Sequence, residues 1–147
     1  MTTYDFFVAG RWRNRNRVHE VLATVRANGY SAYCFIENTY SDEKITFGPD
    51  DDPAEFMRQS EALPQDDPLV RQIFETDVAR EREASRFLLV LPAGAAGHIE
   101  AGIAFGLGKP CFAVGDLAKT ETLYCIFDQI FPDTDALHRW LAAGQSH

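Results

Sequence analysis

Glu100 is the first candidate for a catalytic carboxylate in this sequence. It lies in the segment Gly97-His98-Ile99-Glu100-Ala101-Gly102, where a helix is predicted to begin at about Gly97. A glutamate in the first turn of a helix is favoured in its ionised form by the positive end of the helix dipole. The same spacing also fits a glutamate that only complements this dipole, so the role of Glu100 depends on its surroundings.

Asp77 is a second candidate, because it shares a predicted helix face with apolar residues. The helix is expected over residues 68–83, and its apolar face consists of Val70, Ile73, Phe74 and Val78. Asp77 falls on that same face. A carboxylate in such a place is costly unless it is paired or used in chemistry. The alternatives are a residue at the edge of the face and an ion-pair partner of an arginine such as Arg11.

Two further segments suit a small anion. The first predicted strand is followed by four alternating arginines, Arg11, Arg13, Arg15 and Arg17. The turn Pro92–Gly97 consists almost wholly of small residues, which let a ligand approach the backbone N–H groups at a helix start. The four arginines are equally consistent with a solvated first helical turn. His98 is consistent both with a local hydrogen-bonding role and with donation of a hydrogen bond to a substrate. Neither a Walker loop nor GxGxxG occurs, so ATP and dinucleotides have little support.

Composition limits the class of protein. The chain has 147 residues, of which 46% are apolar and 24% charged, and we expect a single domain over residues 1–147. A net charge of −8 disfavours a nucleic-acid polymer as partner. The sequence contains no apolar run long enough to span a membrane and no signal peptide, so we expect a cytoplasmic protein without a membrane partner.

The cysteines indicate neither a disulfide framework nor a metal site. Cys34, Cys111 and Cys125 all lie in apolar stretches and are expected to be buried, reduced thiols. No pair of Cys or His residues has the spacing of metal ligands. We therefore expect no metal and no other cofactor.

Alternating strands and helices position these candidates. Apolar runs predict strands at residues 5–9, 30–36, 87–91, 111–114 and 129–131. Periodicity and caps predict a first helix that ends at Asn28-Gly29, and further helices over residues 68–83, 97–108, 121–127 and 133–143. The last helix is capped by Asp133 or Thr134. Residues 38–67 are expected to form a long loop with one short helix near residues 54–63.

This order predicts a single doubly wound α/β sandwich of the flavodoxin or Rossmann-like type, with a mainly parallel five-stranded sheet. Ligands in such folds bind beyond the carboxyl ends of the strands. Three segments follow strands in this way, namely Gly10–Arg13, Glu37–Tyr40 and Pro92–Glu100.

These segments resemble the signature of the nucleoside 2-deoxyribosyltransferase-like superfamily, which includes 2′-deoxynucleoside 5′-monophosphate N-glycosidases. Residues 97–104, followed by Gly108-Lys109-Pro110, look like the family's glycine-flanked glutamate and the end of its helix. Residues 7–12 look like the first ligand-binding loop, and Glu37-Asn38-Thr39-Tyr40 looks like the motif after the second strand. Asp77 falls where the family carries a catalytic aspartate.

The resemblance implies a retaining reaction at the anomeric carbon. Glu100 would be the nucleophile that forms a covalent glycosyl-enzyme, and Asp77 would protonate the leaving base and orient the nucleophile. Transfer to water gives an N-glycosidase, and transfer to another base gives a deoxyribosyltransferase. The resemblance further implies a homodimer whose partner helps to close the site. The substrate-binding residues that it implies are Ala9, Gly10, Arg11, Trp12, Arg13, Glu37, Asn38, Gly94, Gly97 and His98.

The sequence also departs from the family pattern. Residues 93–96 contain neither the acidic residue nor the serine that the family carries in this loop, and Ser85-Arg86 replaces an acidic residue before the third strand. The arginine cluster favours a nucleoside 5′-monophosphate over a free nucleoside. The bare loop leaves open a non-catalytic nucleotide-binding or sensing module on the same fold. A response-regulator-like domain is disfavoured, because the first strand ends in Ala-Gly-Arg and not in an acidic pair for magnesium.

Overall fold

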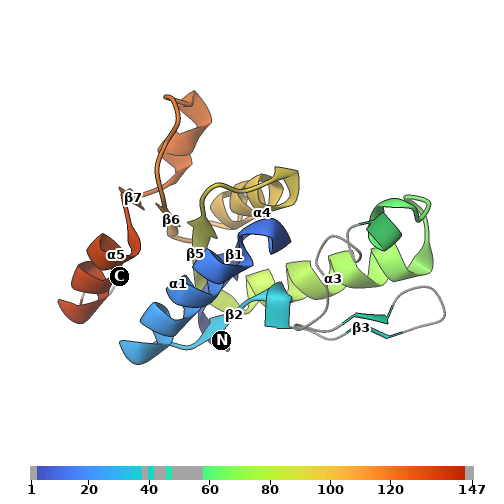
Figure 1. Ribbon diagram of the computed structural model, residues 1–147, viewed down its shortest axis with the longest axis horizontal. Coiled ribbons are helices and arrows are strands. Elements are labelled where there is room, and N and C mark those ends of the chain that lie inside the picture. The colour runs from blue at the N-terminus through green and yellow to red at the C-terminus, as the bar shows by residue number, and fades with distance from the viewer. Residues whose placement is uncertain (1–2, 38–39, 42–45, 48–57, 145–147) are drawn as a thin grey trace.

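The protein is built on one five-stranded parallel sheet, seen in a computed structural model that describes residues 3–37, 40–41, 46–47 and 58–144 (Figure 1). The strands are ordered β2-β1-β5-β6-β7, and all four neighbouring pairs are parallel. Their bounds are β1 Tyr4–Ala9, β2 Ala32–Tyr33, β5 Ala84–Val90, β6 Cys111–Val114 and β7 Gln129–Phe131. The predicted doubly wound α/β fold with a five-stranded sheet is confirmed.

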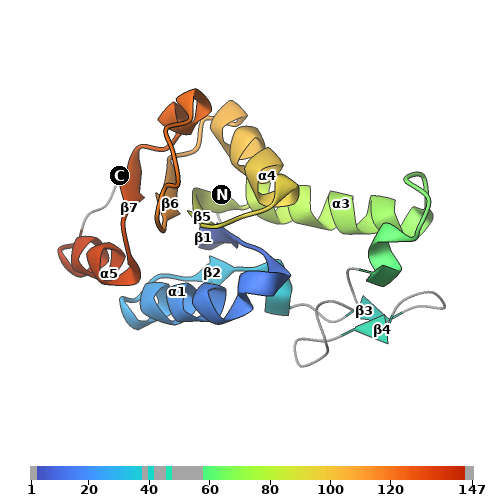
Figure 2. The same ribbon diagram turned by 45° about the horizontal axis from the view of Figure 1, so that its top comes forward.

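The central strands β1 and β5 are apolar on both faces because helices cover both faces of the sheet. Phe6 and Val8 point into one core, which α1 (Arg15–Ala27) and α5 (Thr134–Ala142) cover. Phe7 and Ala9 point into the other core, on the side of α4 (Ala95–Gly106). Figure 2 shows α1 and α5 on one side of the sheet and α4 on the other.

The long helix α3 (Pro68–Arg82) packs against α4 and β5 and extends beyond the sheet (Figures 1 and 2). Asp67 caps it by accepting a hydrogen bond of 2.9 Å from the backbone N–H of Leu69. Asp133 caps α5 in the same way, with a 2.8 Å bond from the backbone N–H of Ala136. Both helices therefore begin where their capping residues predict, and Asp133, not Thr134, is the cap of α5.

The second predicted strand is shorter than its apolar run. Only Ala32 and Tyr33 pair with β1, and the 3-10 helix η2 (Phe35–Glu37) replaces the rest of the expected strand over residues 30–36. Cys34 and Ile36 are nevertheless buried in the core, which explains why the run is apolar. The apolar residues of this segment therefore indicate burial and not strand pairing.

The segment expected as a long loop contains more regular structure than predicted. Strands β3 (Tyr40–Ser41) and β4 (Thr46–Phe47) form a two-stranded antiparallel sheet. Residues 58–61 are helical, within the span of the expected short helix. Residues 121–127, expected to be helical, contain the 3-10 helix η3 (Thr122–Ile126).

The prediction that all three cysteines are buried is wrong for Cys125. Cys34 and Cys111 are buried, but Cys125 is exposed because η3 buries none of its own residues. Among the residues that the structure describes, no three His, Cys, Asp or Glu side chains are grouped as metal ligands. No helix in this part of the chain is both long and apolar enough to cross a membrane.

Candidate active site

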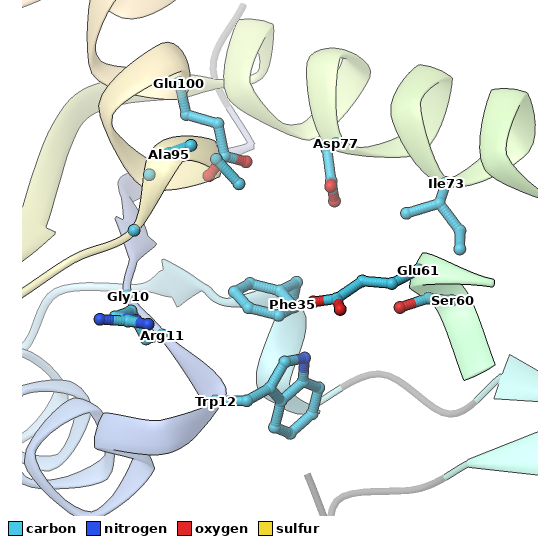
Figure 3. Close-up of a pocket in the computed structure, with 13 residues that line it drawn as sticks. Gly10, Arg11, Trp12, Phe35, Ser60, Glu61, Ile73, Asp77, Ala95 and Glu100 are labelled. Carbon is cyan, nitrogen blue, oxygen red and sulfur yellow. The ribbon is translucent and has the colours of Figure 1, made fainter. Parts of the chain in front are cut away.

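A cavity of about 390 Å³ lies beyond the carboxyl ends of β1, β2 and β5 (Figure 3). This is the edge of a parallel sheet where ligands bind, and the volume suits a small organic molecule. The loop after β1, η2, helix α3, the 58–61 segment and helix α4 with its N-cap supply its walls. They contribute Gly10, Arg11, Trp12, Phe35, Ser60, Glu61, Ile73, Asp77, Gly94, Ala95, Ala96, Gly97 and Glu100.

Asp77 and Glu100 project into this cavity from two packed helices, α3 and α4 (Figure 3). Oδ1 of Asp77 is buried and has no hydrogen-bond partner among the described residues. Burial raises the pKa of Asp77 to about 6. The predicted apolar face of α3 is wrong at Phe74, which is 51% exposed, because the inward row runs through Ile73 and Asp77.

Glu100 is not in the first turn of its helix. Helix α4 begins at Ala95, two residues before the predicted start, so Glu100 lies in the second turn. Burial, together with the negative charges of Asp77 and Glu81, raises the pKa of Glu100 to about 8. The expectation that the helix dipole keeps this carboxylate ionised is therefore wrong, because desolvation is the larger effect.

Glu81 is a third carboxyl group beside the cavity, and the sequence analysis missed it. It follows Asp77 by one helical turn on α3, and its side chain is 1% exposed. The signal was present, because residues four apart on a helix lie on the same face.

Arg11 and the start of α4 form a cationic corner of the cavity. A Cβ atom placed on Gly94 would lie 3.5 Å from Nε of Arg11, so the arginine side chain passes over this glycine. Gly94 is the N-cap of α4 and has no side chain to satisfy the first backbone N–H groups of the helix. Within the described part of the chain, no acidic side chain forms an ion pair with Arg11. These groups together suit an anion.

Gly97 allows α4 to approach the sheet closely. A Cβ atom at this position would lie 2.9 Å from Cδ1 of Leu89 on β5. Gly10 has the same role after β1, where a Cβ atom would collide with the side chain of Val18. The two glycines therefore keep the cavity walls near the sheet.

His98 supports the loop before α4 and does not line the cavity. Its Nδ1 lies 2.8 Å from the carbonyl oxygen of Gly94, and its Nε2 lies 2.7 Å from the hydroxyl oxygen of Tyr124. Because a carbonyl only accepts, Nδ1 carries the proton and Nε2 accepts from the tyrosine. His98, which was predicted to donate to a substrate, thus has both ring nitrogens in hydrogen bonds within the protein.

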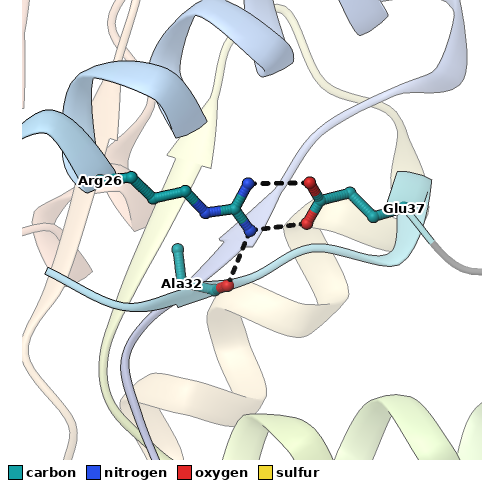
Figure 4. A network of polar contacts seen from close by, with 3 residues as sticks. All are labelled: Arg26, Ala32 and Glu37. Carbon is teal, nitrogen blue, oxygen red and sulfur yellow. Dashed lines mark hydrogen bonds and ion pairs between the residues drawn. The ribbon is translucent and has the colours of Figure 1, made fainter.

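Glu37 is held by an ion pair away from the cavity. Its carboxylate accepts two hydrogen bonds of 2.7 and 2.8 Å from Arg26, which also donates to the carbonyl of Ala32 (Figure 4). The hydrogen bonds from Arg26 lower the pKa of Glu37. The pair ties η2 to the end of α1, which is a structural role for a residue expected to bind substrate.

The remaining predicted residues divide into those that meet at the cavity and those that do not. Gly10, Arg11, Trp12, Gly94 and Gly97 line the cavity with the two carboxyl groups. Ala9 is buried in the sheet and Arg13 is exposed outside the lining. Asn38 lies outside the described residues.

The sequence analysis also missed an apolar wall and a polar edge. Phe35 meets Trp12 edge to face with ring centroids 5.2 Å apart, and Ile73 extends this wall. Ser60 and Glu61 line the opposite edge, and Figure 3 shows the Glu61 carboxylate directed toward Phe35. The apolar runs contained Phe35 and Ile73. A loop as long as the one expected over residues 38–67 is often a lid or a substrate loop, but the sequence did not single out Ser60 or Glu61 within it.

Solved structures provide a comparison for this arrangement. A 2-deoxyribosyltransferase from Bacillus psychrosaccharolyticus superposes with a TM-score of 0.64 at 13% identity, over 90% of this chain and 89% of that one. A CMP N-glycosidase from Clostridium botulinum superposes with a TM-score of 0.55 at 12% identity, over 92% of this chain and 96% of that one. The chain therefore shares the fold of these two enzymes. No protein-family model and no curated protein matches the sequence, so the similarity rests on the fold alone.

The raised pKa values of Asp77 and Glu100 predict a protein that becomes less stable as pH rises. The folded chain retains both protons at pH values where the unfolded chain, with pKa values of 3.8 and 4.5, has released them. Their favourable contribution is complete below these values and is lost as pH passes about 6 and then about 8. Urea unfolding at about pH 5 and about pH 9 measures the loss.

The variant Glu100→Gln should lose less stability over this interval, because glutamine has no proton to release. Glu75→Gln, on the exposed part of α3, is the matched control and should keep the wild-type dependence. An unchanged pH dependence in Glu100→Gln contradicts the assignment of a buried, protonated Glu100.

Proposed function

We propose that this protein cleaves the base–sugar bond of a nucleoside or nucleoside 5′-monophosphate, as an N-glycosidase or a deoxyribosyltransferase. The observation that carries the proposal is the pair Asp77 and Glu100, which enter one cavity from two helices at the carboxyl edge of the sheet. The fold shared with a 2-deoxyribosyltransferase and a CMP N-glycosidase supports it.

In the proposed reaction, Glu100 and Asp77 have different roles. A Glu100 oxygen attacks C1′ of the sugar, the bond from C1′ to the base nitrogen breaks, and the base takes a proton from Asp77. Water or a second base then attacks C1′ and releases Glu100 as a carboxylate, while Asp77 takes back a proton. Without the charge of a substrate, Asp77 has the lower pKa, about 6 against about 8 for Glu100. Positive charge that develops on the sugar favours ionised Glu100.

The two ends of the cavity suit the two ends of a nucleotide. Trp12, Phe35 and Ile73 form an apolar wall on which a base can stack. Arg11 and the start of α4 form the corner suited to a 5′-phosphate. This arrangement supports a nucleoside 5′-monophosphate as the preferred substrate.

Loss of the nucleophile should abolish turnover. We expect Glu100→Gln to reduce base release from the best substrate by at least about a thousandfold, because the amide cannot form the glycosyl ester. The assay incubates the protein with a panel of ribo- and deoxyribonucleosides and their 5′-monophosphates and measures free base by chromatography. Mass spectrometry of the quenched wild-type protein should detect a sugar or sugar-phosphate adduct on Glu100.

Glu20→Gln, an exposed substitution on α1, is the control and should retain wild-type turnover. Equal base release by Glu100→Gln contradicts the proposed nucleophile. Saturable nucleotide binding by the wild type without release of base from any substrate contradicts the enzymatic function. That outcome favours the non-catalytic binding module, for which the small-residue loop 93–96 is the specific observation.

Arg11 should distinguish a nucleotide from a nucleoside. Removal of a hydrogen bond to a charged group costs roughly 1.5–3 kcal/mol, so Arg11→Ala should raise KM for the 5′-monophosphate by roughly 10- to 100-fold. KM for the matching nucleoside should change little. Arg13→Ala is the control, because Arg13 is exposed and does not line the cavity. An equal effect of Arg11→Ala on both substrates would show that Arg11 does not bind the phosphate.

We also propose that the protein forms a homodimer through the outer face of α4 and the adjacent η3. Ile99, Phe105 and Leu123 are 63%, 55% and 74% exposed on these elements. Exposed apolar side chains of this size are typical of surfaces that another protein covers. A second copy of this chain is the occupant that the family resemblance implies.

Light scattering coupled to size exclusion should give the mass of a dimer for the wild type. Phe105→Glu should give a monomer, because a charge cannot be buried in an apolar contact without a partner. Phe74→Glu is the matched control at a 51% exposed phenylalanine on α3 and should remain dimeric. A monomeric wild type, or an equal effect of both substitutions, contradicts this interface.

A further inference from the structure

Glu81 has a position that the proposed reaction does not explain. It is the only residue of α3 that is fully buried, with 1% of its surface exposed. Neither carboxyl oxygen has a hydrogen-bond partner among the described residues. A carboxylate in such surroundings is far less stable than a neutral carboxyl group. The site therefore favours a protonated Glu81.

The charged and titratable groups around Glu81 come from each element packed against it. Asp77 lies one turn earlier on α3, Glu100 faces it from α4, and Cys111 approaches from β6. Lys109 is the nearby cation, and its ammonium group donates to the carbonyls of Arg82 and Ala84.

Burial has the largest effect on Glu81. Burial and then the charge of Asp77 raise the pKa of Glu81 to about 8, although Lys109 opposes them. Negative charge on Glu81 in turn raises the pKa of Glu100. The ionisation of Glu81 and that of Glu100 therefore compete.

We propose that Glu81 is a positioning residue that stores a proton behind the cavity and so allows Glu100 to carry the negative charge. When Glu81 is neutral, it no longer repels the carboxylate of Glu100, and Asp77 is the other acid of α3 whose charge acts on this group. When Glu81 is ionised, it opposes the same charge on Glu100. The kinetic consequence rests on the proposed glycosidase or transferase function, but the stored proton can be tested without it.

The variant Glu81→Gln tests the stored proton through stability. Glutamine is neutral at every pH and has nearly the shape of a protonated glutamate. Because the pKa of Glu81 is raised from 4.5 to about 8, its contribution to folding is complete below 4.5 and is lost as pH passes about 8. Urea unfolding should therefore show a smaller loss of stability toward about pH 9 in Glu81→Gln than in the wild type.

Glu75→Gln, exposed on the same helix, should follow the wild type in this experiment. Glu81 is ionised in the folded protein if the stability difference between Glu81→Gln and the wild type does not change with pH. The same conclusion follows if the variant is less stable than the wild type and this difference grows toward high pH. Either result overturns the proposal. This unfolding experiment tests the stored proton even if the protein releases no base from any nucleotide.

The second readout is the dependence of kcat/KM on pH. Removal of the competing acid should allow Glu100 to ionise more readily, so the acidic limb in Glu81→Gln should move to lower pH by roughly half a unit or more. A purely structural role would lower stability and leave this limb in place. An unmoved limb in an active Glu81→Gln variant overturns the positioning role, whereas a wild type without any activity contradicts the proposed function and not the stored proton.

Discussion

The site depends on one electrostatic constraint, which is that three carboxyl groups share a region that can hold little negative charge. Asp77, Glu81 and Glu100 meet where α3 packs against α4, and burial is the largest cause of the raised pKa in each of them. The charge of Lys109 offsets only part of this desolvation, because its ammonium group donates to the carbonyls of Arg82 and Ala84. Protons must therefore be distributed among the three groups.

The same constraint separates the acids from the cation that would bind an anionic substrate. Arg11 follows β1, and its side chain lies beside Gly94 at the start of α4 and not next to the buried acids. An arginine paired with Glu100 would hold the carboxylate ionised but would leave no free charge for a phosphate. Because the acids and Arg11 are apart, each can serve a different end of one ligand.

The parts of the fold that the sequence predicts well are those in which burial and local structure agree. Strand β6 and residues 87–90 of β5 are continuous apolar runs because both faces of the sheet are covered, and α3 and α5 begin at their aspartate caps. The prediction fails where burial occurs without regular structure. Cys34 and Ile36 are buried although the strand has already ended at Tyr33, so an apolar pattern alone overestimates its length.

Part of the candidate site was predictable from the sequence, but its apolar wall and its electrostatics were not. Loop order at one edge of a parallel sheet brings Gly10, Gly94 and Glu100 together, and this follows from topology. Glu37 lies in the expected segment, yet an arginine eleven residues earlier in the chain, Arg26, holds its carboxylate. Such a pairing depends on how the end of α1 meets the end of β2, which residue spacing does not specify.

The start of α4 shows how a shift of two residues changes the chemistry of a side chain. Had the helix begun at Gly97, Glu100 would lie in the first turn, where backbone dipoles favour a carboxylate. Gly94 is the N-cap instead, its carbonyl accepts from His98, and Tyr124 holds the other nitrogen of this ring. The start of the helix is thus fixed by contacts from η3, which lies far along the chain. Glu100 consequently faces α3 from the second turn, where burial and then the charges of its two acidic neighbours, and not the dipole of its own helix, determine its pKa.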